Sequence, residues 1–282
     1  MSNNNAFPLS RRGALALMSG LGAALVTPGA QAGNPASTAA PRLQLKPPSR
    51  TDYDVIVVGA GFAGVTAARE VSRAGLSTLV LEARNRVGGR TFTNQFAGDQ
   101  VELGGTWVHW SQPHVWAEIS RYGFSLKESA GAVPDVMSWV AEGRTHRAKA
   151  EQILPRVSAL FDRYCNVDGQ GGRVAAPLAH DPFANPEALK QWDRLSLQDR
   201  LNQLKVSRAD QDLISPLLTI DCHNDPRLGG FYSQLQWWAL GDYDFGRMFD
   251  KLGRFKIAQG MNALSTAILN DAHADILLGT PV

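Results

Sequence analysis

The chain has 282 residues, of which 44% are hydrophobic and 19% are charged, and its formal net charge is +2. This is the composition of an ordinary globular protein, long enough for one large domain or two small ones. So small a net charge argues against a nucleic-acid partner. The two cysteines, Cys165 and Cys222, have no C-x-x-C spacing, which argues against a zinc site and leaves at most one disulfide.

The first segment is typical of an export signal. Residues 10–15, Ser-Arg-Arg-Gly-Ala-Leu, resemble a twin-arginine motif, and the apolar run at 14–26 is too short to span a bilayer. An A-x-A sequence at 30–32 provides a cleavage site, so residues 1–32 are predicted to direct the protein to the periplasm without a stable membrane anchor. A general secretion signal is the alternative. Residues 33–51 are rich in Pro, Ala and Ser and are expected to form a flexible linker.

The next segment joins a strand to a glycine-rich turn. Residues 55–58 form an apolar, β-branched run, typical of a buried parallel strand, which leads directly into a G-x-G-x-x-G sequence at 59–64. The three glycines have separate purposes. Gly59 permits a tight turn, Gly61 lets the backbone approach a pyrophosphate, and Gly64 permits close packing of helix on strand.

A helix and a second strand complete this unit. The helix is predicted over roughly residues 62–74, and the backbone N–H groups of its first residues, Phe62 and Ala63, are expected to face the phosphates. The second strand, residues 77–81, ends at Glu82, 23 residues after the first glycine, where a carboxylate can hold a ribose diol. The combination predicts dinucleotide binding. The alternative is a turn that serves packing alone.

The following residues indicate which dinucleotide is bound. Residues 82–91, E-A-R-N-R-V-G-G-R-T, resemble the second signature of flavin amine oxidases and their relatives. In that family the segment lies along the FAD pyrophosphate and its last arginine approaches the flavin. The resemblance therefore assigns these residues to FAD: Ala83, Arg84, Gly89 and Arg90. Glycines let the backbone pass close to a bulky cofactor, and a guanidinium offers a fixed fork of donors to phosphate. A solvated charge is the alternative for Arg84, and Arg86 is interpreted as one.

A third loop resembles the same family. The resemblance assigns to the flavin side a loop whose backbone passes beside the isoalloxazine ring: Gly104, Gly105, Thr106 and Trp107. Trp107, His109 and Trp110 are candidates for the substrate side, with core packing as the alternative for the tryptophans. Ser111 is expected to cap the next helix. As a whole, residues 104–123 are similar to the bacterial nicotine and pseudooxynicotine oxidases, which are secreted members of the flavin monoamine oxidase family.

Residues 125–250 lose the alternation of strands and are predicted to be mainly helical, as the family's substrate domain is. Ser196 and Ser207 each precede an acidic residue by three positions, a pattern typical of helix starts. Residues 221–223, Asp-Cys-His, lack the partners that a metal site or a catalytic nucleophile requires, and no metal is predicted. Three aromatic residues are candidates for the pocket wall, with core packing as the alternative: Trp238 in the first place, then Trp237 and Tyr243.

The final segment resembles the family's cofactor domain again. Residues 255–264 match its strand–glycine–helix element, except that Gln259 replaces the first of two adjacent glycines, which puts the tight backbone geometry there in doubt. A last strand at 276–278 leads to Val282, whose counterpart in the family contacts adenine through its backbone.

The predicted fold class is α/β, with a Rossmann-like FAD-binding domain of the glutathione-reductase type and a largely helical substrate domain. The first comprises residues 52–124 and 251–282, the second residues 125–250. The resemblance covers residues 52–282 but only the amino-terminal part of a family member. The fold is therefore expected to be truncated at its carboxyl end, either because the sequence is shortened or because a second polypeptide completes it. The chain alone is expected to be poorly soluble and nearly flavin-free.

The resemblance implies FAD-dependent oxidation of an amine, in which a hydride passes from the α-carbon to the flavin and the resulting imine is hydrolysed. The expected substrate is a nicotine-like or pseudooxynicotine-like secondary amine, and the expected electron acceptor is oxygen or a periplasmic redox protein. The complete protein could form a homodimer. No catalytic residue is assigned. Two alternatives stay open: a C–C desaturating flavoprotein of the same architecture, and a non-catalytic FAD-binding fragment.

Overall fold

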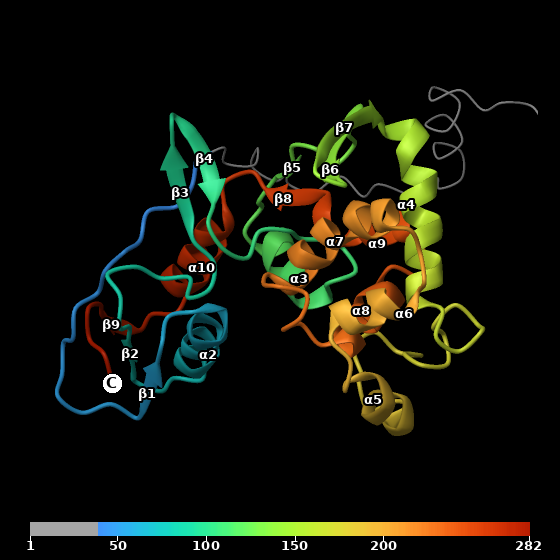
Figure 1. The fold of residues 1–282 in the computed structure, drawn as a ribbon. Coiled ribbons are helices and arrows are strands. Elements are labelled where there is room, and N and C mark those ends of the chain that lie inside the picture. Colours follow the sequence, from blue (N-terminus) through green and yellow to red (C-terminus); the bar gives the residue numbers. More distant parts are fainter. Residues whose placement is uncertain (1–38) are drawn as a thin grey trace, which may run out of the picture. The chain divides into compact units, whose positions relative to one another are not determined.

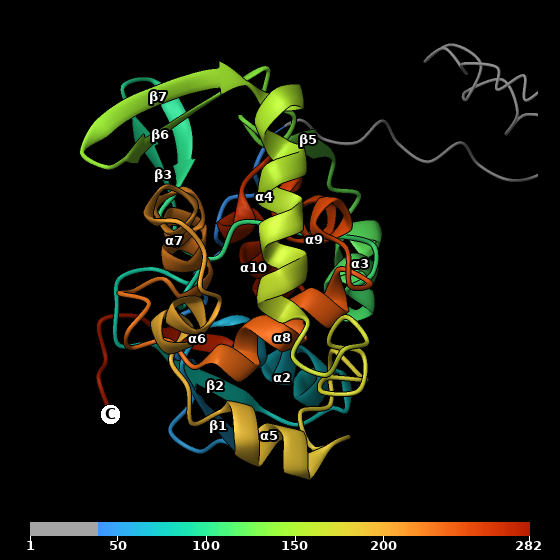
Figure 2. The same ribbon diagram turned by 45° about the vertical axis from the view of Figure 1, so that its right-hand side comes forward.

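A computed structural model describes residues 39–282, and Figures 1 and 2 show the fold from two directions. The predicted signal peptide and the first part of the predicted linker lie outside these residues. The strands in the described range are β1 (Val55–Val58), β2 (Thr78–Leu81), β3 (Thr93–Phe96), β4 (Asp99–Glu102), β5 (Leu126–Glu128), β6 (Val136–Ala141), β7 (Arg144–Lys149), β8 (Phe255–Ile257) and β9 (Asp275–Leu277). The helices there are α2 (Phe62–Arg73), α3 (Pro113–Arg121), α4 (Ala150–Cys165), α5 (Pro186–Trp192), α6 (Leu197–Gln203), α7 (Arg208–Cys222), α8 (Phe231–Leu240), α9 (Phe245–Gly253) and α10 (Met261–Asn270).

A parallel sheet of strands β1, β2 and β9, in that order, confirms the predicted strand–turn–helix–strand unit. Val80 and Ile276 on this sheet are buried together with Val65 of α2 and Ile268 of α10, so these two helices share one hydrophobic core with the sheet (Figure 1). The prediction that β1 is a buried strand was wrong for every second residue. Ile56 and Val58 are 56% and 64% exposed, because β1 is an edge strand whose other face is uncovered in the described chain.

Contrary to expectation, the predicted flexible linker is tied to the end of α10 through Arg42 and Gln44, and to the sheet through Lys46 and Ser49. The backbone oxygen of Lys46 accepts a hydrogen bond from the amide of Ile276, which covers part of the outer edge of β9. The Asp275 carboxylate accepts from both the amide and the hydroxyl of Ser49, and from the hydroxyl of Tyr53. These partners lie more than 200 residues away in the sequence, so composition alone could not indicate them.

Two β-hairpins were not predicted, and the second of them lies in the region expected to be helical. Strand β3 pairs with β4, and β6 pairs with β7, both antiparallel. Each turn consists of two residues with positive φ, Ala97-Gly98 in the first and Glu142-Gly143 in the second. Such turns match the twist of paired strands, and a glycine in second place favours them.

A second hydrophobic core is built mainly from helices between residues 150 and 253, as predicted. Helix α4 contacts α7, α8 and α9, and Figure 2 shows it running past these helices. The predicted helix starts are confirmed, since the hydroxyls of Ser196 and Ser207 accept hydrogen bonds from the amides of Asp199 and Asp210. Strand β5 pairs with β8, so the two ends of this region are joined before the chain enters α10.

Helix α3 begins at Pro113, but Ser111 does not cap it. Gln112 occupies the cap position without a side-chain bond, and the Ser111 hydroxyl lies 2.7 Å from Nδ1 of His109 instead. None of the helices within residues 39–282 combines the length and the apolar composition needed to cross a membrane.

Candidate functional site

A cleft of about 1400 Å³ lies where the three predicted loops meet. Ligand pockets commonly measure about 300–1,000 Å³, so this cleft has room for a ligand as large as a dinucleotide. Its walls come from the start of α2, the loop after β2, the hairpin β3–β4 with the loop that follows it, and isolated residues farther along the chain. Ten predicted cofactor residues line it: Gly61, Phe62, Ala63, Arg84, Gly89, Arg90, Gly104, Gly105, Thr106 and Trp107.

The first loop turns sharply from β1 into α2. Gly59 has a φ of +96°, a conformation open mainly to glycine, and its amide donates to the oxygen of Leu81 at 2.7 Å. A Cβ atom on Gly64 would overlap the carbonyl oxygen of Gly59, so only glycine allows helix and turn to pack this closely. No side chain caps α2 at Gly61. The helix therefore presents unsatisfied N–H groups to the cleft, as an anion site requires.

The second loop packs directly on the first. The amide of Gly88 donates to the oxygen of Ala60 at 2.9 Å, and a Cβ on Gly89 would lie 3.1 Å from the Cα of Gly61. The missing side chain of Gly89 lets the two backbones approach this closely, whereas a Cβ on Gly61 would lie at an ordinary contact distance of 3.7 Å from the Cα of Gly89. Arg84 and Arg90 line the cleft, and within residues 39–282 neither guanidinium has a hydrogen-bond or ion-pair partner.

Arg86 is not the solvated charge that the sequence suggested. Its guanidinium donates to the carbonyl oxygens of Val87, Gly89 and Thr91 and stacks over the ring of Phe92, with 4.3 Å from Cζ to the ring centroid. Arg86 thus fixes the shape of the second loop from behind. The arginines of the motif therefore have different roles. Arg86 holds the loop, whereas Arg84 and Arg90 line the cleft.

Glu82 joins the two loops. One carboxylate oxygen accepts from the amide of Ala60 at 2.7 Å, and the other accepts from the amide of Arg84 at 2.8 Å. The side chain is 4% exposed and is not among the residues that line the cleft. Each oxygen has a second lone pair, so the predicted bond to a ribose remains a prediction. In the described chain its observed partners are backbone amides.

The third loop passes behind Arg90. A Cβ on Gly104 would overlap the carbonyl oxygen of Arg90, and the amide of Gly105 donates to that oxygen at 3.1 Å. Trp107 is 41% exposed, and its indole Nε1 donates to the hydroxyl of Ser129 at 3.0 Å. This bond orients the indole ring of Trp107, which lines the cleft, and its role on the substrate side stays a prediction.

Three residues proposed for the substrate pocket lie elsewhere. His109 is 2% exposed, and its Nε2 is 3.8 Å from a carboxylate oxygen of Asp250. Burial lowers the pKa of this imidazole. Trp110 is 54% exposed but packs near Trp116 and Phe255, outside the cleft. Trp238 is 1% exposed and lies in the helical core, so the alternative of core packing holds for it.

Besides Glu82, four predicted cofactor residues do not line the cleft. They are Gly59, Gly64, Ala83 and Val282. Val282 is 87% exposed. Gln259, by contrast, does not disturb the element it occupies. It is buried against Ser125, while Gly260 takes the positive φ of +91° before α10, so the tight turn forms.

The structure also brings to the cleft residues that sequence reasoning missed. Lys256 of β8, bridged through its backbone to Trp107, adds a cation to the wall. His223, which ends α7 with a φ of +52°, also lines the cleft. A lysine inside a short strand and a histidine at a helix end carry no local signal, because long-range packing alone places them. Both cysteines are free, and no cluster that could hold a metal occurs among residues 39–282.

The pattern that describes flavin-containing amine oxidoreductases matches residues 62–282. The chain belongs to this family. It is 41% identical over 235 residues to pseudooxynicotine dehydrogenase of a Pseudomonas species, a match covering 83% of this chain and 46% of that protein. It is 35% identical to nicotine dehydrogenase of Pseudomonas putida, covering 82% and 47%. Among solved structures, putrescine oxidase bound to putrescine superposes with a TM-score of 0.62 at 24% identity, covering 82% of this chain and 51% of that one.

The chain thus spans about half the length of the relatives it matches. The cofactor of this family is FAD, and the residues of the cleft fit it. Three backbone segments approach one another at positions where side chains would collide, an uncapped helix start faces the cleft, and two unpaired guanidinium groups line it. This is the donor set that a pyrophosphate requires.

Proposed function

We propose that the protein takes part in the FAD-dependent oxidation of a small amine, with a nicotine-like or pseudooxynicotine-like secondary amine as substrate. The observation that carries the proposal is the contact of the loops at 59–64 and 88–91, whose mutual approach leaves an anion-binding cleft. The names of the two Pseudomonas relatives support the choice of substrate. FAD, when bound, accepts a hydride from the carbon next to the amine nitrogen, and the imine then reacts with water.

The residues of this chain have binding and shaping roles in the proposal. The amides of Phe62 and Ala63, with Arg84 and Arg90, hold the diphosphate. The third loop, from Gly104 to Trp107, passes along the flavin side. The indole of Trp107 then provides an apolar surface for the amine, and an apolar surface favours the neutral form that can give up a hydride. No side chain of the described residues is assigned as a general base.

Anaerobic flavin reduction tests the proposal. Purified protein is loaded with FAD, alone and together with the carboxyl-terminal half of a homologous oxidase, and mixed with pseudooxynicotine, with a primary amine or with a polyene. We expect the amines to bleach the visible flavin bands of the completed protein, and the polyene to leave them unchanged. Bleaching by the polyene would favour a C–C desaturase. A completed, FAD-loaded protein that no amine reduces would contradict amine oxidation.

We further propose export to the periplasm by the twin-arginine route. Support comes from residues 10–15 and the cleavage site at 30–32, which lie outside the described residues. A protein that folds around FAD before export needs a route that accepts folded chains. Replacing Arg11 and Arg12 by lysines keeps the charge and should leave the precursor in the cytoplasm, as measured by cell fractionation. Undiminished periplasmic protein would favour the general secretion route instead.

A further inference from the structure

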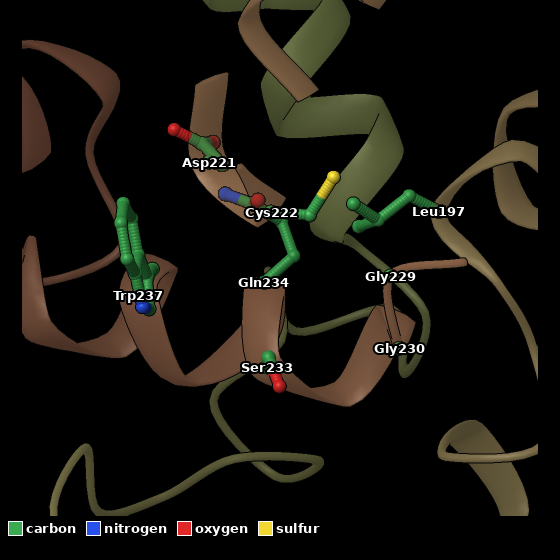
Figure 3. A pocket seen from close by; sticks show the side chains of 8 residues that line it. All are labelled: Leu197, Asp221, Cys222, Gly229, Gly230, Ser233, Gln234 and Trp237. Carbon is green, nitrogen blue, oxygen red and sulfur yellow. The ribbon is translucent and has the colours of Figure 1, made fainter. Parts of the chain in front are cut away.

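A second cavity, of about 280 Å³, lies at the end of α7, where this helix meets α6 and α8. Figure 3 shows its wall, to which Gln234 and Trp237 of α8 contribute together with Asp221. The Oδ2 atom of Asp221 has no hydrogen-bond partner, but it is buried with almost no accessible surface, so it cannot bond a ligand in the cavity. An unpaired carboxylate of this kind affects stability rather than binding. The cofactor cleft, by contrast, has cations that a ligand can reach.

Two lysines lie directly opposite each other in the small sheet beside this cleft. Strand β5 pairs antiparallel with β8 (Figure 1), and the register sets Lys127 of β5 against Lys256 of β8. Residues opposite each other on paired strands point to the same face, with Cβ atoms about 4.5–5.5 Å apart, and like charges in such a pair repel. Both side chains are partly buried. The pair therefore places two positive charges on one face of the sheet.

Neither lysine has a carboxylate to balance its charge. Within residues 39–282, no hydrogen bond or ion pair joins either ammonium group to another residue. Glu128, which follows Lys127, pairs with Arg254 instead. Glu102 lines the cleft, but its carboxylate accepts hydrogen bonds from a threonine hydroxyl and from the backbone amide at the start of α10. The repulsion between the two lysines is thus not offset by the described chain.

Lys256 connects this pair to the cleft. It lines the cleft together with Trp107 and Ser129. Trp107 forms an isolated antiparallel bridge with Lys256 on the other edge of β8, so its indole shares the face of the two lysines. The bond from the indole Nε1 to the hydroxyl of Ser129 orients the ring. An apolar ring and two ammonium groups therefore lie side by side in this part of the cleft.

Such a face favours one class of ligand. An ammonium group donates hydrogen bonds and accepts none, so a cation would be repelled by the two lysines. A carboxylate has two oxygens that can accept from both lysines at once, and its charge would relieve their repulsion. The indole beside them favours a carboxylate on an apolar body over inorganic phosphate, which has no apolar surface to bury.

We infer that Lys127 and Lys256 form an anion site in the cleft, which binds a carboxylate whose apolar body lies against Trp107. None of these residues belongs to the loops at 59–64 and 88–91, so the site is separate from the proposed diphosphate site. Its consequence for oxidation rests on the proposed function. Because the indole is the surface proposed for the amine, an apolar carboxylate bound there should compete with the amine substrate.

Calorimetric titration of the full chain tests the anion site without flavin or turnover. The probes are phenylacetate and phenylacetamide, which has nearly the same shape without the charge. At pH 8 we expect saturable binding of phenylacetate alone, weakened about tenfold or more in Lys127→Gln and in Lys256→Gln, as the loss of a charge-assisted hydrogen bond implies. Lys190→Gln is the matched control and should bind as the wild type does. Lys190 of α5 is exposed, has no partner among the described residues and does not line the cleft.

Equal binding of phenylacetamide, or glutamine variants at 127 and 256 that bind phenylacetate as tightly as the wild type does, would overturn the anion site. Inorganic phosphate that binds more tightly than phenylacetate, and loses that binding in Lys256→Gln, would overturn the choice of an apolar carboxylate. Each variant removes the repulsion between the lysines and should unfold at no lower urea concentration than the wild type. Lost binding would then not be a consequence of unfolding.

The competition with the amine is tested in the completed, FAD-loaded protein. Phenylacetate should raise KM for the amine at unchanged kcat, and Lys256→Gln should abolish this inhibition. A lowered kcat at unchanged KM would overturn the competition. A protein that no amine reduces would instead refute the proposed function, whereas the binding titration decides the anion site independently.

Discussion

The cofactor cleft and the cavity at the end of α7 are built in opposite ways. The cleft is shaped by backbone: glycines at 64, 89 and 104 bring chain segments together where a methyl group would crowd or overlap the neighbouring backbone. The cavity is shaped by side chains of three helices, and its distinguishing feature is one carboxylate without a full set of partners. A site made of backbone leaves a local glycine pattern in the sequence. A site made of side chains from distant helices leaves none.

The largest change in the free energy of unfolding is expected at Gly64, where the backbone is packed too closely for a side chain. Gly64→Ala places a Cβ atom on the oxygen of Gly59, so the turn must open, which we expect to cost about 3 kcal/mol in the free energy of unfolding and to abolish nucleotide binding. Gly253→Ala is the matched control. It is also a helical glycine, but the nearest atom to its Cβ is 3.9 Å away, so it should gain up to about 1 kcal/mol. Urea denaturation measures both, and equal stabilities would contradict the packing argument.

In the cavity at the end of α7, a substitution of Asp221 is expected to raise the free energy of unfolding, whereas Gly64→Ala lowers it. The pKa of Asp221 lies above its ordinary value of 3.8, at about 6, so the ionised form destabilises the fold, and the cost is complete only above pH 6. Asp221→Asn should therefore be more stable than the wild type by about 3 kcal/mol at pH 8, with the advantage vanishing as the pH falls below 4. Urea midpoints measured from pH 4 to pH 8 test this.

Asp225 offers the opposite case, four residues along the chain from Asp221. The hydrogen bond from Arg227 lowers the pKa of Asp225 to about 2, so its carboxylate is favoured in the folded protein above pH 4. Asp225→Asn should therefore be slightly less stable than the wild type at pH 8. A parallel pH dependence for both variants would show that burial of Asp221 is not the cause.

The sequence predicted features that depend on a local pattern better than features that depend on side chains from distant helices. The first strand, the turn at Gly59 and helix α2 were found from local patterns, because each depends on residues within one short segment. The loop at 104–107 was assigned from the family resemblance instead. Trp238 and His109 were misplaced, since whether an aromatic ring lies in a core or in a pocket depends on helices far along the chain. The role of Arg86 was missed for a related reason: its partners are carbonyl oxygens, which any residue possesses.

Within the cleft, Arg86 and Arg84 of the second loop are expected to differ in their effects on stability and on nucleotide binding. Arg86→Lys loses the fork that holds three carbonyl oxygens, so we expect a loss of about 1–2 kcal/mol in the free energy of unfolding. Arg84→Gln removes a cleft cation without such contacts. It should change stability by less than about 0.5 kcal/mol but weaken ADP binding about tenfold. Equal losses of stability would contradict the assigned division of roles.

A small effect on the free energy of unfolding is also expected on the uncovered side of the sheet. Ile56 and Val58 are largely exposed, so replacing both by threonine should change the free energy of unfolding by less than about 1 kcal/mol. The double variant should bind less of the dye ANS and scatter less light, because exposed apolar edges recruit other chains. Val57→Thr alters the covered face of the same strand and should destabilise more than the double variant. The reverse order would mean that the apparently open face is covered in solution.

The central claim is that a diphosphate binds where α2 begins, between the two glycine loops. Its most direct test is an NMR titration of the ¹⁵N-labelled chain with ADP, which carries the diphosphate and the ribose without the flavin ring. The account predicts saturable shifts of the amides of Gly61, Phe62 and Ala63. It also predicts no shift at Gly230, which begins α8 without a side-chain cap in the same way. Unmoved amides at 61–63 under saturating ADP, or equal shifts at Gly230, would contradict it.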